Sequence, residues 1–86
     1  MIFEYDPEKS KFNLAKHGID FEQGQRLWDD PSYTIVKAKI IDESRYLAIG
    51  MVDGKYWSAV FTFREKKIRI ISIRRSRTEE IEIYES

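Results

Sequence analysis

The sequence predicts an α+β domain in which two N-terminal helices pack on a four-stranded antiparallel β-meander, with a short C-terminal helix. Helix-capping signals are concentrated before Pro31. Four stretches rich in β-branched and aromatic residues follow, and the connections between them are short. With 86 residues there is room for only one hydrophobic core, so residues 1–86 are expected to form a single domain.

The first helix is expected to follow a short strand at residues 2–5. Asp6 is a favourable N-cap residue and Pro7 suits the first helical position. Gly18 is expected to end the helix, because glycine readily adopts the left-handed backbone conformation found just after a helix. The apolar stripe that packs this helix on the sheet is expected to comprise Phe12, Leu14 and Ala15.

A second helix is expected to begin directly after the first. Asp20 and Gln23 have the spacing of a capping box, and Pro31 prevents the helix from continuing. Its buried face is expected to comprise Phe21, Leu27 and Trp28.

Four strands are then expected, joined as a meander. Asp53-Gly54 is the strongest turn signal, because glycine accepts the positive φ that a two-residue hairpin needs. Two helices can cover only one face of such a sheet, so the other face is expected to stay partly open. The expected strands are residues 33–41, 45–52, 56–63 and 67–75.

The C-terminal segment fits two patterns. Thr78 can cap a short helix with Glu79 and Glu80 in its first turn, where acids suit the helix dipole. The run Glu80-Ile81-Glu82-Ile83 also alternates like a strand. We favour the helix.

Composition excludes several kinds of site. The chain has no cysteine, which rules out disulfides and thiol catalysis, and one histidine is too few for a transition-metal cage. We therefore expect no metal or other cofactor. No apolar stretch is long enough to span a membrane and nothing resembles a signal peptide, so we expect a cytoplasmic protein without a membrane partner.

The zero net charge conceals a strongly basic segment. Residues 64–77 hold seven bases and one acid, a net charge of +6. In a regular strand Lys67, Arg69 and Arg75 share one face, while Ser72 and Arg74 lie on the other. This strand either binds phosphate groups or is an edge strand kept soluble by its charges, and charge alone favours the second interpretation.

His17 is a candidate acid or base, because histidine is the side-chain type that titrates near neutral pH. Its place beside Gly18 also suits a simpler role, in which it bonds the last carbonyl groups of the helix. The simpler role is favoured unless another observation points to this residue.

Two longer motifs together resemble the BrnT-type toxins, the ribonuclease halves of bacterial type II toxin–antitoxin pairs. The first is Asn13-Leu14-Ala15-Lys16-His17-Gly18, and the second is Arg69-Ile70-Ile71-Ser72-Ile73-Arg74-Arg75. The similarity extends over nearly the whole chain and includes Glu43-Ser44-Arg45-Tyr46.

The resemblance implies a RelE-like fold that binds RNA on the open face of the sheet and cleaves it without a metal. It also implies inhibition of translation and growth, and neutralisation by a BrnA-type ribbon-helix-helix antitoxin. In such pairs DNA is contacted only indirectly, through the antitoxin. The expected roles are catalytic for His17, Arg69, Arg74 and Arg77, and RNA-binding for Lys16, Arg45 and Arg75.

Two features complicate this expectation. Arg69 and Arg74 point to opposite faces of a regular strand, so a bulge or strand end near residues 72–74 is needed to bring them together. The acidic tail, from Glu79 to Glu85, can pair with the arginines and weaken the positive electrostatic field that RNA meets.

The alternative function is a non-catalytic module that binds an antitoxin or another protein. The hypothesis that the chain binds duplex DNA directly has less support than these two, since no helix expected from the sequence carries the basic residues.

Overall fold

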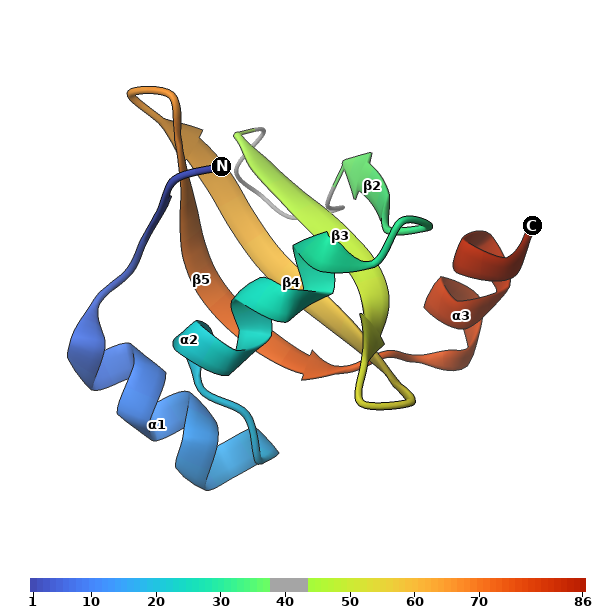
Figure 1. Ribbon diagram of the computed structural model, residues 1–86, viewed down its shortest axis with the longest axis horizontal. Helices are drawn as coiled ribbons and strands as arrows, with labels where there is room; N and C mark the ends of the chain where they lie inside the picture. Colours follow the sequence, from blue (N-terminus) through green and yellow to red (C-terminus); the bar gives the residue numbers. More distant parts are fainter. Residues whose placement is uncertain (38–43) are drawn as a thin grey trace.

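A computed structural model describes residues 1–37 and 44–86 of the chain (Figure 1). It confirms the α+β class, with helices on both sides of a twisted sheet. In chain order the elements are β1 (Phe3–Glu4), α1 (Pro7–His17), α2 (Phe21–Gly24), the 3₁₀ helix η1 (Gln25–Asp29), β2 (Thr34–Lys37), β3 (Arg45–Val52), β4 (Lys55–Arg64), β5 (Lys67–Arg75) and α3 (Thr78–Glu85).

The sheet is mixed and five-stranded, in the order β1-β5-β4-β3-β2. The prediction of a four-stranded antiparallel sheet was therefore wrong in detail, because β1 pairs in parallel with β5. The antiparallel meander from β2 to β5 is confirmed. Of the strand expected at residues 33–41, β2 forms Thr34–Lys37, and residues 38–43 lie outside the described part.

The predicted caps and turn are confirmed. The Asp6 side chain accepts a hydrogen bond from the Glu8 backbone N–H at 2.9 Å, and Asp20 and Gln23 form the capping box. Asp53 and Gly54 have φ values of 51° and 76°, as a turn with two left-handed residues requires. The second helix differs from expectation, because its α-helical part has only four residues before the 3₁₀ turn.

The expected packing face of α1 was wrong. Phe12 and Leu14 are 69% and 44% exposed, whereas Ser10 and Asn13 are buried. The reason lies at the edge of β5, where the Asn13 side-chain amide bonds both the N–H and the C=O of Ile73. This helix is therefore attached through polar groups, and Phe12 and Leu14 stay outside the core.

The core lies between the sheet and the α2–η1 segment, which crosses one face of the sheet in Figure 1. Phe21, Leu27 and Trp28 are buried there, as predicted. The Trp28 ring packs edge-on against Phe61, with 5.5 Å between centroids. Gly50 of β3 lets η1 approach closely, since a Cβ atom there would lie 3.0 Å from the Leu27 carbonyl oxygen.

The C-terminal segment is helical, as favoured from the sequence. Thr78 is the first helical residue rather than the cap, and Arg77 is the N-cap residue. Because Glu80 bonds Ser58 and Arg74, which face away from the core, α3 begins on the side of the sheet opposite α2. The face expected to be open is therefore partly covered.

Candidate functional site

The sheet face turned away from α2, here called the outer face, carries a row of polar side chains across four strands. Glu4, Arg69, Thr62 and Arg45 are successive cross-strand partners, so their side chains lie on the same face. Arg64 and Lys67 form the next pair toward the end of the β4–β5 hairpin. This end of the outer face therefore holds four cations around one threonine hydroxyl.

Arg69 lies at the centre of this row and is partly accessible. Its Nη1 donates to the Glu4 carboxylate at 2.9 Å, and a third of its side chain is exposed. The Arg64 guanidinium lies 3.9 Å from the same carboxylate oxygen and is more exposed. Glu4 thus balances part of the local positive charge and orients Arg69 from β1.

A β-bulge determines which arginines share the outer face. Val60 pairs with Ser72 while the next residue of β4, Phe61, pairs with Ile70, so Ile71 is the extra residue of β5. The bulge reverses the alternation expected for a regular strand and puts Arg74 on the same face as Arg69. A regular strand would place Arg69 and Arg74 on opposite faces, and the irregularity needed to bring them together is present.

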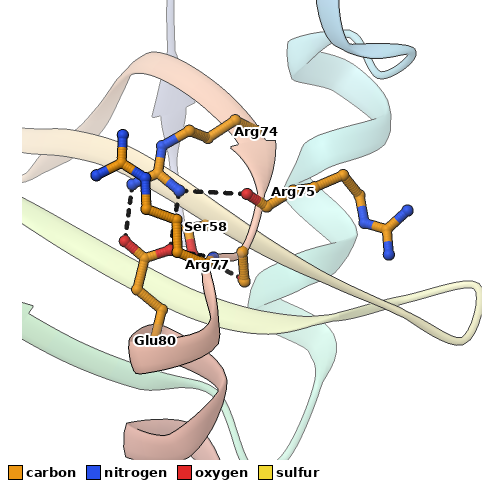
Figure 2. Close-up of polar contacts among 6 residues, drawn as sticks. Ser58, Arg74, Arg75, Arg77 and Glu80 are labelled. Atoms are coloured by element: carbon orange, nitrogen blue, oxygen red, sulfur yellow. Dashed lines mark hydrogen bonds and ion pairs between the residues drawn. The ribbon is translucent and has the colours of Figure 1, made fainter.

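Arg74 is engaged by the first turn of α3. Figure 2 shows the Glu80 carboxylate facing its guanidinium, with Nη1 and Nη2 donating at 2.8 and 2.7 Å. The Ser58 hydroxyl and the Arg77 backbone N–H each donate to the same carboxylate at 2.9 Å. Burial opposes ionisation of Glu80, yet these hydrogen bonds outweigh it and lower the pKa of Glu80 to about 2.

Arg75 and Arg77 are placed differently from Arg74. The Arg75 side chain extends to the opposite side in Figure 2, where its guanidinium lies 5.5 Å from the centre of the Trp57 ring. Arg77 is exposed and contributes its backbone N–H to the Glu80 cluster. Arg69 and Arg74 therefore share the outer face, and Arg75 is directed away from it.

Lys16 and His17 lie at the C-terminal end of α1, beside β5. Together with Phe12, Ile71 and Ser72 they line an open groove of about 440 Å³. Ser72 lies on the outer face between Arg69 and Arg74, because it pairs with Val60. His17 thus lies at the edge of the basic strand rather than within the row of arginines.

A model of the BrnT family, described as ribonuclease toxins of type II toxin–antitoxin systems, matches residues 5–80 of the chain. The match spans most of its length. The chain belongs to the BrnT family. Comparison with curated proteins gives no match. Family membership implies an RNA target and an antitoxin partner.

Sequence reasoning missed several residues of this BrnT-family site. Thr62 and Arg64 join Lys67 and Arg69 through strand pairing, and Ser58 holds Glu80 from β4. The short connection after Arg64 was a usable signal, because a two-residue turn pairs Arg64 with Lys67 and hence Thr62 with Arg69.

The position of α3 depends on two tyrosines, Tyr56 of β4 and Tyr84 of α3 itself. The Tyr84 hydroxyl donates to the Asp30 carboxylate at 2.6 Å, and the Tyr56 hydroxyl donates to Glu85 at 2.5 Å. The bond to Asp30, with some burial, raises the pKa of Tyr84 to about 12. These contacts join the end of α3 to η1 and β4.

The described part of the chain has neither a metal-binding cluster nor a membrane-spanning helix. Among residues 1–37 and 44–86, no three acidic or histidine side chains gather closely enough to hold a metal ion. No helix in these ranges is both long and apolar enough to cross a membrane.

Proposed function

We propose that this BrnT-family chain is a cytoplasmic endoribonuclease that cleaves RNA on its outer face without a metal, and that a BrnA-type ribbon-helix-helix antitoxin neutralises it. Contact with DNA is then made only through the antitoxin, and RNA cleavage inhibits translation and growth. The observation that supports this best is the row of Arg69, Thr62 and Arg45, with Arg74 on the same face.

The cations would act by holding negative charge. When the 2′-hydroxyl attacks the neighbouring phosphorus, the phosphate passes through a phosphorane that carries extra charge on its oxygens. Fixed guanidinium groups stabilise such charge, and this is commonly the largest catalytic contribution in sites of this kind. Arg69 is best suited to this role, because among the described residues only its Nη1 is engaged, by Glu4, and the guanidinium has four further N–H donors.

Proton transfer completes the reaction. The 2′-oxygen loses a proton as it bonds to phosphorus, and the 5′-oxygen gains one as its bond to phosphorus breaks. The products are a 2′,3′-cyclic phosphate and a free 5′-hydroxyl. In this proposal His17 moves a proton, which contributes about 10²–10⁴-fold. The remaining contacts that position RNA would come from Lys16, Arg45 and Arg77. Arg75, which was expected to bind RNA, has no part in this proposal, because its guanidinium lies over Trp57 on the opposite face of the sheet.

One observation favours the alternative function, a protein-binding module without catalysis. Arg74 is held on both Nη atoms by Glu80, which leaves fewer donors for a phosphate, and α3 occupies part of the outer face. A toxin that is inactive in this way would retain its fold and its antitoxin surface. The two functions differ in a single measurable respect, which is cleavage.

The proposal is tested by incubating labelled single-stranded RNA with the purified chain in the presence of EDTA. We expect cleavage by the parent protein and a loss of at least tenfold in rate for Arg69→Ala. Arg26→Ala is the matched control, because Arg26 is also an ion-paired arginine but bonds Asp53 away from the outer face.

Each result has a defined meaning. Equal rates for Arg69→Ala and the parent would remove Arg69 from the site. Cleavage that EDTA abolishes would contradict metal independence. RNA that is bound but never cleaved would favour the non-catalytic module.

A further inference from the structure

Phe12 is 69% exposed on α1, although a domain of this size needs its aromatic side chains for the core. Its neighbour Asn13 occupies the contact with β5 in its place. Phe12 therefore lines the groove beside β5 rather than the core.

The bulge gives this groove its second apolar wall. Ile71 is the residue that the bulge displaces from the β4–β5 pairing, and it lines the groove together with Phe12. Both apolar walls are thus produced by irregular features, the polar attachment of α1 and the extra residue of β5. A groove with an aromatic wall of this kind suits a flat, apolar ligand.

The charges around the groove favour a nucleotide over an apolar peptide. Lys9 and Lys16 line it together with His17, against the single acid Glu8. Ser72 joins the groove to the outer face, between Arg69 and Arg74. A strand of RNA that follows the basic row therefore reaches this groove without leaving the protein surface.

We propose that the groove is a nucleobase subsite, in which an unpaired base of single-stranded RNA stacks on Phe12 while Lys9 and Lys16 contact the adjacent phosphates. Proteins commonly hold unpaired bases by stacking them on aromatic side chains beside cationic groups. The subsite rests on the proposed RNA-cleaving function and adds to it a set of contacts with the base itself. It gives Lys16 and His17 a position next to a bound nucleotide.

The test uses 2′-O-methylated RNA, which cannot undergo 2′-hydroxyl attack, labelled for fluorescence anisotropy. A series of the same oligonucleotide carries one abasic position at each site in turn. We expect one abasic position to weaken binding to the parent by about tenfold, and Phe12→Ala to weaken binding of the intact RNA by a similar factor. In Phe12→Ala the same abasic position then has no further effect, since both changes remove one contact.

Two matched variants complete the design. Leu14→Ala removes an exposed apolar side chain from another side of α1 and is expected to bind RNA like the parent. Phe12→Trp retains an aromatic surface and is expected to restore affinity. Unchanged affinity in Phe12→Ala, or an equal loss at every abasic position, would overturn the subsite.

Arg69→Ala separates failure of the subsite from failure of the proposed function. If Arg69→Ala loses RNA binding but Phe12→Ala does not, the outer face binds RNA and the subsite is wrong. If the parent binds no RNA, both proposals are wrong. If Phe12→Ala binds RNA normally but loses the antitoxin, the groove is a protein interface and the subsite is again overturned.

Discussion

Glu80 accepts hydrogen bonds from three different groups on the outer face. It bonds Arg74, Ser58 and the Arg77 backbone N–H, and only 12% of its side chain is exposed. One carboxylate therefore links β4, β5 and the start of α3. The same contact limits the donors that Arg74 can offer to a phosphate.

Replacing Glu80 with Gln removes the charge while retaining the shape. We expect unfolding to become easier by about 2–3 kcal/mol, because Arg74 loses a charged partner in a partly buried place. We also expect tighter RNA binding, since the freed guanidinium faces the same side as Arg69. Chemical denaturation and RNA anisotropy measure the two effects, with Glu79→Gln, an exposed neighbour, as control.

The stability effect also has a defined pH dependence. The pKa of Glu80 falls from 4.5 to about 2 on folding, so its contribution is complete above about pH 4.5 and is lost as the pH falls toward 2. The stability difference between parent and Glu80→Gln should therefore shrink at pH 3. A stability difference that is the same at pH 7 and pH 3 would contradict the assigned ion pair between Glu80 and Arg74. If Glu80→Gln binds RNA with the same affinity as the parent, Arg74 does not contact the RNA.

At the scale of elements, α1 is held on β5 by one buried amide. Asn13 donates to the carbonyl oxygens of Ile19 and Ile73 and accepts from the Ile73 N–H. The two bonds to Ile73 satisfy backbone groups of β5, and the bond to Ile19 fixes the connection between α1 and α2. This attachment also fixes the position of the groove beside Phe12.

Asn13→Ala should destabilise the fold by about 2–4 kcal/mol, because it leaves the Ile73 N–H and C=O buried without partners. Leu14→Ala is the control and should cost much less than Asn13→Ala, since Leu14 is 44% exposed and lies outside the core. Thermal or urea unfolding measures both. A small effect for Asn13→Ala would mean that α1 is held by other contacts.

Local chemistry predicted the elements well, and long-range contacts explain what it did not predict. Asp6, Gly18 and the Asp53-Gly54 turn act on neighbouring residues, so their effects are visible in a short stretch of sequence. The face that α1 presents depends on a bond between residues 60 positions apart, which no periodicity reveals. The two arginines indicated that a bulge or strand end near residues 72–74 was needed, but not that the bulge lies at Ile71, because the run of isoleucines is apolar with or without it.

For the whole molecule, the opposite charges of the chain meet on one surface. The segment from Arg64 to Arg77 has a net charge of +6, and the acidic helix α3 starts on the same face of the sheet. The hairpin end, with Arg45, Arg64, Lys67 and Arg69, is the strongly cationic part of the described outer face. A neutral protein can thus present a local field suited to RNA.

The chemistry at this surface is tested most directly by the ends of the cleaved RNA. We predict that the purified chain, in EDTA, cuts single-stranded RNA to leave a 2′,3′-cyclic phosphate and a 5′-hydroxyl. A single 2′-deoxy nucleotide at the cleaved position should block the reaction, because the attacking hydroxyl is then missing. Cleavage that persists at the deoxy position, or that requires Mg²⁺ and leaves a 3′-hydroxyl, would contradict the account.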